Sequence, residues 1–405
     1  MMTEGVDCSR GPAPQQQGSP LPIKLLYILA ICAGASVANL YYAQPLLAQI
    51  TKTFDGSMPV GWVAVAPMIG YTLSLISVLP MGDLVDRRKL CIALAATMAI
   101  GAFGCAIAPS MFVLAVASAI VGFGAVVTQL ILPMAADLVP GSQRARALGI
   151  VFSGVLAGIL VARTVSGLVG QKYGWQTMFV LAGIAAIALA ITLARCLPTL
   201  TPGTTQNYLS LFSSMWQMLK RHPSLRTACV IQACLFGLFT SFWSVLALLL
   251  SNSPFEMGPA AIGAFGMVGV VGVVAANVSG RLMERFGIAR TRLIGIVCCL
   301  VAYLFFSFEI SIFGLVTGVV LMDFGISIAN VSSQSSILGL ESAARNRINT
   351  LYVTSIFLGG SIGASLASIG WIHEGWRAVG VLGVIFSLVA LTVHLAGERR
   401  STIFR

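Results

Sequence analysis

Gly-Asp-Leu-Val-Asp-Arg-Arg-Lys at residues 82–89 and Gly-Arg-Leu-Met-Glu-Arg-Phe-Gly at residues 280–287 share one pattern. In each stretch a glycine and then a leucine precede an acidic residue and an arginine, and each stretch follows a long apolar run. The second copy starts 198 residues after the first (280 against 82). A motif that returns at the same place relative to its apolar run indicates two related halves.

Two further features repeat at an offset of 201 residues. They are an arginine pair after an apolar run and a Gly-Trp pair between two runs: Arg144 and Arg146 with Arg345 and Arg347, and Gly174-Trp175 with Gly375-Trp376. These repeats predict that the two halves of the chain arose by duplication and have the same orientation in the membrane. Two such halves are related by a pseudo-two-fold axis along the membrane normal.

Composition sets the class of protein. Of the 405 residues, 57% are hydrophobic and only 9% are charged, whereas about a quarter of the residues of a soluble domain are charged. The sequence predicts an all-α integral membrane protein, in which spans of about 20 apolar residues leave no room for a large soluble catalytic domain. A net charge of +11 does not here indicate a nucleic-acid partner, because its distribution fits membrane topology.

Twelve apolar runs are long enough to be transmembrane helices. They cover about residues 24–45, 60–81, 90–108, 111–136, 147–170, 176–197, 227–251, 260–282, 291–309, 311–335, 349–372 and 377–397.

The loops between these runs are asymmetric in charge. Twenty of the 24 basic residues fall on one side, the other side has Lys52, Lys172 and Arg377, and Arg163 falls within a span. Since cytoplasmic loops carry the Lys and Arg residues, we expect both termini in the cytoplasm and a multi-pass protein of the bacterial inner (plasma) membrane.

The domain organisation follows from these runs. Residues 1–22, rich in Gly, Pro and Gln, predict a disordered cytoplasmic tail. Residues 23–197 and 227–397 predict two six-helix bundles, and 398–405 a second cytoplasmic tail. The linker at 198–226 has apolar residues at helical spacing, which is typical of a helix on the membrane interface; a partly ordered tether is the alternative.

The duplication and the loop motif together resemble the major facilitator superfamily. Its signature after the second helix is Gly-x-Leu-x-Asp-Arg-x-Gly-Arg-Lys; residues 82–89 lack the x-Gly before the basic pair, whereas the second copy keeps the glycine at 287. The resemblance implies twelve transmembrane helices in two pseudo-symmetric six-helix bundles around a central cavity, no enzymatic activity, and a monomer.

Residues 39–47, Asn-Leu-Tyr-Tyr-Ala-Gln-Pro-Leu-Leu, are similar to the opening of a group of bacterial drug and sugar efflux proteins. Residues 158–167 stand where the antiporters of this family carry a Gly-Pro-Gly-Gly signature in the fifth helix, and Arg163 and Thr164 replace its proline. The resemblance favours proton-coupled efflux.

Asp323 is one of two clear charges within the spans, where a charge costs about 2.5–3.5 kcal/mol on insertion scales. Ser327, Asn330 and Gln334 follow it at steps of four, three and four, so all four share one helical face. That face should line the cavity, where Asp323 could bind and release a proton during transport. The alternative is an ionised anchor bonded to neighbouring helices.

Polar and aromatic residues on the other helices expected to line the cavity are, as a set, candidate substrate ligands, although each alone is more typical of helix packing than of a ligand site. With Asn330 and Gln334, the candidates are Asn39, Gln129, Gln232 and Trp243. The aromatic residues suit an amphipathic organic molecule better than an inorganic ion.

Arg163 is the second intramembrane charge, and Ala364 stands at its position in the other half. It could bind an anionic group of a substrate, pair with a carboxylate such as Asp323, or extend toward the membrane interface.

The loop motifs are candidate gating elements: Gly82, Asp86 and Arg87, with Gly280, Glu284 and Arg285 in the second copy. The family resemblance implies that Asp137 pairs with Arg87. The alternative is that these charges serve topology only.

The sequence thus predicts a secondary transporter that exports small organic solutes, drug-like or sugar-like, in exchange for protons. A proton symporter or a uniporter importing a solute on the same scaffold is the alternative. We expect no cofactor or metal, because no phosphate-binding loop or ligand cluster is present in the sequence. The three histidines, His222, His373 and His394, are scattered, which argues against a membrane-embedded enzyme. Substrate identity and proton stoichiometry stay open.

Overall fold

The computed structural model describes residues 23–54, 61–140, 143–198, 208–308, 311–337, 339–341 and 345–403. The predicted tail at 1–22 lies outside the described residues. Helices account for the described architecture, and nine of them are long and apolar enough to cross a membrane. Shorter apolar helices supply the remaining spans, because three spans are broken or short.

The first half of the chain contains six spans. Their elements are α1 (Ile23–Ala38) with η1 (Gln44–Leu46) and α2 (Leu47–Thr53), α3 (Gly61–Ser77) with η2 (Leu79–Asp83), α4 (Arg87–Ala106), α5 (Met111–Gly124) with α6 (Val127–Asp137), α7 (Arg144–Tyr173) and α8 (Trp175–Cys196).

The second half repeats this order. After the linker helix α9 (Tyr208–Arg221), its elements are α10 (Pro223–Ser251), α11 (Pro259–Phe265) with η4 (Gly266–Gly269), α12 (Val270–Phe308), α13 (Ile312–Ile337), α14 (Arg345–Glu374) and α15 (Trp376–Ile403). α12 contains the end of one span and the whole of the next, with a kink at Gly287 (φ 80°). α15 extends beyond residue 397, into the predicted C-terminal tail.

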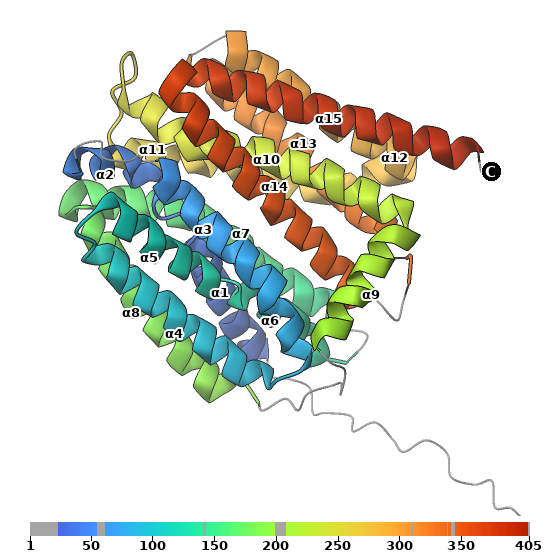
Figure 1. The fold of residues 1–405 in the computed structure, drawn as a ribbon, viewed down its shortest axis with the longest axis horizontal. Coiled ribbons are helices and arrows are strands. Elements are labelled where there is room, and N and C mark those ends of the chain that lie inside the picture. Colours follow the sequence, from blue (N-terminus) through green and yellow to red (C-terminus); the bar gives the residue numbers. More distant parts are fainter. Residues whose placement is uncertain are drawn as a thin grey trace, which may run out of the picture.

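Figure 1 shows the two halves as two groups of helices, blue to green and yellow to red, that lie side by side. We call the end that carries α9 and the loops with Arg87 and Arg285 the basic end. The other end, where α2 and α11 lie, we call the opposite end.

The duplication is visible at two turns of the opposite end. Gly174 (φ 85°) and Gly375 (φ 58°) adopt backbone conformations that favour glycine, and each is followed by a tryptophan that begins the next helix. Both indoles are buried. Trp175 Nε1 donates to Thr53 Oγ1 at 3.1 Å, and Trp376 Nε1 donates to the Phe306 carbonyl at 2.8 Å.

Glycines let corresponding helices approach closely within each half. A Cβ atom at Gly158 on α7 would lie 2.3 Å from the carbonyl oxygen of Gly34 on α1. In the second half, a Cβ at Gly363 on α14 would lie 2.0 Å from the carbonyl oxygen of Gly237 on α10. Backbone contact of this kind is how membrane helices gain packing energy without a hydrophobic driving force.

The two halves are packed together toward the opposite end and at mid-span. The backbone amide of Ala260 donates to Gln171 Oε1 at 3.1 Å, and Thr164 Oγ1 donates to the Gly263 carbonyl at 3.3 Å, so α7 holds α11. On the other side of the molecule, the hydroxyls of Thr72 and Ser361 are 3.1 Å apart and join α3 to α14.

At the basic end, the linker helix α9 touches both halves. The Tyr208 hydroxyl donates to the Ser77 carbonyl at 2.7 Å, and Arg347 at the start of α14 donates to the Ser214 hydroxyl. These two hydrogen bonds connect each half to α9 at the basic end, whereas toward the opposite end α7 of the first half bonds directly to α11 of the second.

Candidate functional site

Arg163 lies on α7 at the contact between the halves, and its side chain is 3% exposed. Its Nε donates to Gln44 Oε1 at 2.8 Å. The guanidinium carbon is 3.9 Å from the centre of the Trp243 ring and 4.9 Å from that of Tyr41. The side chain therefore does not extend to the membrane interface: it lies between aromatic rings, an arrangement that stabilises a desolvated cation.

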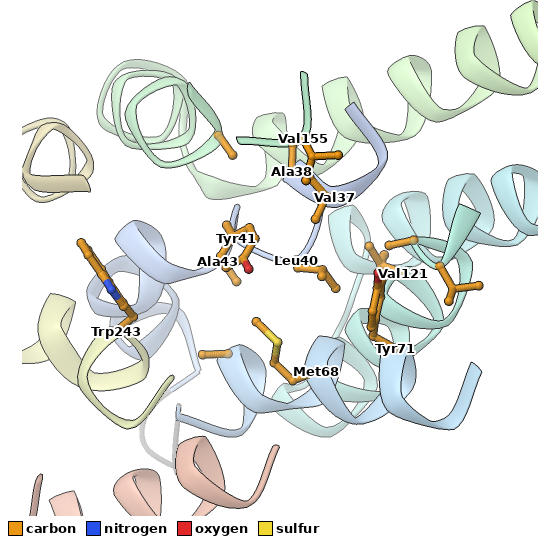
Figure 2. Packing of buried hydrophobic residues seen from close by; sticks show 14 of the residues in the cluster. Val37, Ala38, Leu40, Tyr41, Ala43, Met68, Tyr71, Val121, Val155 and Trp243 are labelled. Carbon is orange, nitrogen blue, oxygen red and sulfur yellow. The ribbon is translucent and has the colours of Figure 1, made fainter. Parts of the chain in front are cut away.

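The rings come from different halves. Figure 2 shows Trp243 on α10, drawn in yellow, beside Tyr41, which belongs to the blue segment between α1 and η1. Arg163 therefore joins three segments: its own α7, the end of the first span, and the seventh span.

A small cavity of about 10 Å³ lies beside the guanidinium. Gln44, Arg163 and Trp243 contribute its polar lining, and the remaining lining residues are apolar: Pro45, Leu246, Ala247 and Ile262. A volume of this size has room for about one water-sized species.

Asp323 is the twelfth of the 26 residues of α13 and is 7% exposed. Its Oδ2 would lie 3.1 Å from a Cβ atom at Gly269, and its own Cβ would lie 3.8 Å from one at Gly272. No Lys, Arg or His nitrogen of the described residues lies within 4.0 Å of its carboxylate. The carboxylate and the Arg163 guanidinium are therefore not in direct contact.

The eighth span contacts both charged side chains and adopts a 3₁₀ helix where it does so. Gly266, at the start of η4, faces the Arg163 stem, where a Cβ would lie 2.9 Å from Cδ, while Gly269 at its end faces Asp323. In a 3₁₀ helix, residues three apart are on the same side and about 6 Å apart along the axis. Larger residues at positions 266 and 269 would displace the charged side chains of Arg163 and Asp323.

The other predicted substrate residues have different surroundings. The Gln129 amide donates to the Tyr71 hydroxyl at 3.0 Å, and Asn330 Oδ1 accepts from the Tyr352 hydroxyl at 2.6 Å. Asn39 Nδ2 donates to the Ala35 carbonyl of its own helix. Gln232 is almost fully buried on α10, and Gln334 is half-buried.

Unpartnered polar atoms gather at the predicted residues. In the described part of the chain, nine buried side-chain nitrogen or oxygen atoms have no hydrogen-bond partner. Five belong to residues predicted from sequence: Asn39 Oδ1, Arg163 Nη2, Gln232 Oε1, Trp243 Nε1 and Asp323 Oδ1. Buried polar groups are usually paired, so the predicted residues account for more than half of the exceptions in the described part of the chain.

A series of aromatic rings runs across the molecule near these groups. Trp243 and Phe239 have ring centres 6.1 Å apart, and Phe239 and Phe236 5.5 Å apart. Phe236 is 5.2 Å from Phe357, which is 4.3 Å from Tyr71 in the other half. Three of these rings are half-buried, so they offer apolar surface to an organic molecule.

Sequence reasoning missed Gln44, Tyr41, Tyr71 and Phe357. A signal existed for Gln44, which is a polar residue beside a proline at the end of an apolar run. The other three are aromatic residues within apolar runs, and nothing in the pattern distinguishes them from lipid-facing residues.

The first loop motif contains the ion pair that the family resemblance implies. Arg87 Nη1 lies 3.1 Å from Asp137 Oδ2, and Arg87 Nε donates to the Gly82 carbonyl at 2.9 Å. Asp86 caps α4, because its Oδ1 accepts from the Arg88 amide at 2.9 Å. The ion pair connects the start of α4 to the end of α6, within one half.

The second loop motif is arranged differently. Arg285 stacks on Phe286 with 5.2 Å between guanidinium and ring centre, and Gly280 has open space around it. Among the described residues, Glu284 has no basic group within 4.0 Å. Two other carboxylates of the second half are engaged: Glu341 Oε1 lies 2.7 Å from His222 Nε2, and Glu398 Oε1 lies 3.3 Å from Arg292 Nη2.

A larger apolar groove of about 800 Å³ lies between α1 and α7. Its α7 residues, among them Val161 and Val165, are on the face of that helix turned away from Arg163, since they are about half a turn from it. The groove is therefore separate from the charged site.

Comparison with known proteins decides the family. The family model described as Major Facilitator Superfamily matches residues 26–340. The chain belongs to the major facilitator superfamily. It is therefore a multi-pass membrane transporter and not an enzyme.

Relatives and solved structures agree with this assignment. The uncharacterized transporter YgaY of Escherichia coli is 32% identical over 389 residues, which cover 96% of this chain and 98% of that protein. A probable transporter of Streptomyces coelicolor is 32% identical over 361 residues, 87% of this chain and 83% of that protein.

Two crystal structures share the fold. A bacterial homolog of the human lysosomal transporter Spinster, inward-facing and unoccupied, has a TM-score of 0.75 at 16% identity and covers 94% of this chain and 98% of that one. The nucleoside transporter NupG has a TM-score of 0.73 at 13% identity, covering 93% and 98%. The prediction of a twelve-helix transporter of this superfamily is confirmed.

Proposed function

We propose that this transporter exports small organic solutes in exchange for protons by alternating access, with Asp323 as the proton-binding residue. The observation that carries the proposal is the buried carboxylate in the middle of α13, one oxygen of which has no partner among the described residues. A buried ionised carboxylate without a cation in contact is costly, whereas a protonated one is much less so.

The distribution of basic residues supports one orientation of the protein in the membrane. The end with α9 and the basic loops is the cytoplasmic side by the positive-inside rule, so the tightly packed opposite end faces outward. On this proposal the structure is an inward-facing state, in which the contact between α7 and α11 closes the outer side.

The series of rings from Trp243 to Tyr71 supports an organic solute. Aromatic surface binds apolar parts of a molecule, while a few polar groups fix its orientation. On the proposal these polar groups are Asn39, Gln129 and Gln232, with Asn330 and Gln334 on the same face of α13 as Asp323.

Gating is the proposed role of the basic-end loops. The pair of Arg87 with Asp137 holds the ends of α4 and α6 together, and those ends must move as one unit when the first half rotates. Gly82 and Asp86 belong to the same proposed gating loop. The corresponding residues in the second half are Gly280, Glu284 and Arg285.

The test uses purified protein in liposomes that contain a pH-sensitive dye, with a panel of amphipathic drugs, sugars and amino acids added under an imposed pH gradient. Wild type should move protons when its solute is present, and Asp323→Asn should not. Asp323→Glu, which keeps an ionisable group, should retain part of the proton flux.

Solute exchange without a pH gradient separates coupling from folding. Asp323→Asn should still exchange labelled solute across the membrane, since no net proton movement is needed. Solute flux without protons in wild type would replace the antiporter with a uniporter, and solute entry together with protons would replace it with a symporter. Equal proton flux in wild type and Asp323→Asn would exclude Asp323 as the coupling residue.

A further inference from the structure

Two of the side chains that line the small cavity beside Arg163 contain hydrogen-bond donors without partners. Arg163 Nη2 and Trp243 Nε1 are both buried, both belong to side chains that line the cavity, and neither has a partner among the described residues. Guanidinium and indole N–H groups can only donate. Two unpartnered donors at one cavity call for an acceptor.

In the structure the lining side chains do not supply that acceptor. Gln44 Oε1 accepts from Arg163 Nε but from neither Arg163 Nη2 nor Trp243 Nε1. The other lining side chains are apolar. Arg163 is the charged residue among those that line the cavity, and no carboxylate of the described residues lies within 4.0 Å of its guanidinium.

We infer that this cavity binds an anion through a single acceptor atom held between Arg163 and Trp243. Two sources present such an atom: a chloride ion, or one oxygen of a carboxylate on the transported solute. The size of the cavity, about 10 Å³, matches one atom-sized acceptor and excludes a whole organic molecule. For a solute carboxylate the inference rests on the proposed function; for chloride it stands without it.

The anion would connect the two halves. Arg163 belongs to the first half and Trp243 to the second, so an acceptor bound to both stabilises the contact at the opposite end. When that end opens, the two donors separate and the anion loses one of them. Anion binding therefore favours the state in which this end is closed.

Asp323 should influence the occupancy of the site. Its carboxylate faces η4 at Gly269, one turn along that helix from Gly266, which faces the Arg163 stem. An ionised Asp323 partly balances the positive charge of Arg163, whereas a neutral one leaves that charge to the anion. Asp323→Asn should therefore bind the anion more tightly than wild type.

The experiment measures binding, without transport. Purified full-length protein in detergent is exchanged into a buffer whose anion is the bulky sulfonate MES, and labelled chloride is then added in equilibrium dialysis. In parallel, thermal unfolding is followed at matched ionic strength in chloride, in acetate and in MES. We expect saturable binding of about one anion per chain, and a higher unfolding temperature in the anion that binds.

Trp243→Phe removes the indole N–H but keeps an aromatic ring beside Arg163. Loss of one hydrogen bond to a charged group should weaken anion binding at least about tenfold. The matched control is Trp175→Phe, because Trp175 Nε1 already donates to Thr53; this variant should bind the anion as wild type does. Arg163→Gln should abolish binding.

The outcomes distinguish the sources. Stabilisation of wild type by chloride identifies the ion, and stabilisation by acetate but not chloride identifies a carboxylate; either supports the site. The inference is overturned if all three anions give the same unfolding temperature and no chloride is retained, since a water molecule would then be the acceptor in the cavity. The inference is also overturned if Trp243→Phe binds the anion as tightly as wild type does.

Discussion

The guanidinium carbon of Arg163 lies 3.9 Å from the centre of the Trp243 ring, although the two residues belong to opposite halves of the molecule. A contact of this kind cannot survive a rotation that separates the halves at this end. Under the proposed alternating access, Arg163 and the other contacts that cross the same boundary would therefore form in one state of the transport cycle only.

A disulfide across this boundary should trap that state. The hydroxyl oxygens of Thr72 and Ser361 are 3.1 Å apart, so Thr72→Cys combined with Ser361→Cys places two sulfur atoms within reach of a bond. Oxidation should abolish solute transport, and reduction should restore it. Each single variant is the control, and full transport by completely cross-linked protein would show that α3 and α14 do not separate.

Close packing of α1 on α7 predicts a large effect of one methyl group. In Gly158→Ala the new Cβ would lie 2.3 Å from the Gly34 carbonyl oxygen, which forces the helices apart and should cost about 1–3 kcal/mol. Gly149→Ala on the same helix meets nothing within 4 Å and should be neutral or slightly stabilising. Thermal unfolding in detergent compares the two variants, and equal unfolding temperatures would refute the packing argument.

The ion pair of the first loop should matter more for transport than for stability. Arg87 and Asp137 have side chains 18% and 57% exposed, and such pairs contribute about 0–1 kcal/mol. Asp137→Asn should therefore leave the unfolding temperature nearly unchanged while lowering the transport rate, and Asp137→Glu should recover part of the rate. A rate equal to wild type in Asp137→Asn would reduce the loop to a topological role.

Acid should weaken the contact between the linker and the loop after α13. The hydrogen bond with His222 lowers the pKa of Glu341 below its ordinary value of 4.5, and the charges of His222, Arg221 and Arg347 act in the same direction. A carboxyl with a lowered pKa stabilises the folded protein above the ordinary pKa and loses that contribution as the pH falls through the lowered value.

The variant for this test is Glu341→Gln. Its deficit in unfolding temperature relative to wild type should be full at neutral pH and should shrink as the pH falls below about 4.5. A deficit that stays constant across that range would show that the ionised carboxylate is not what stabilises the contact.

The spans could be predicted because each needs a long apolar run, whatever its packing. The breaks in the helices within these spans could not be predicted. η4 lies within the run 260–282, where glycine and valine are both apolar, so the change from α to 3₁₀ geometry leaves no mark on hydropathy. The position of Asp323 in the middle of its helix followed directly from counting residues.

The partners of the intramembrane charges depend on tertiary structure. Sequence reasoning left Asp323 as a possible partner of Arg163, whereas the structure gives Gln44 and the faces of two aromatic rings. Gln44 is 119 residues away along the chain, and no periodic pattern connects the two. The pair of Arg87 with Asp137 came from family resemblance and not from spacing.

The linker helix limits how the two halves can move at the basic end. Tyr208 holds Ser77 of the first half, and Ser214, six residues later and about 9 Å along the helix axis, holds Arg347 of the second. One helix thus joins the two halves at the basic end. Any change in the distance between Ser77 and Arg347 must therefore break one of these two hydrogen bonds or move α9 with it.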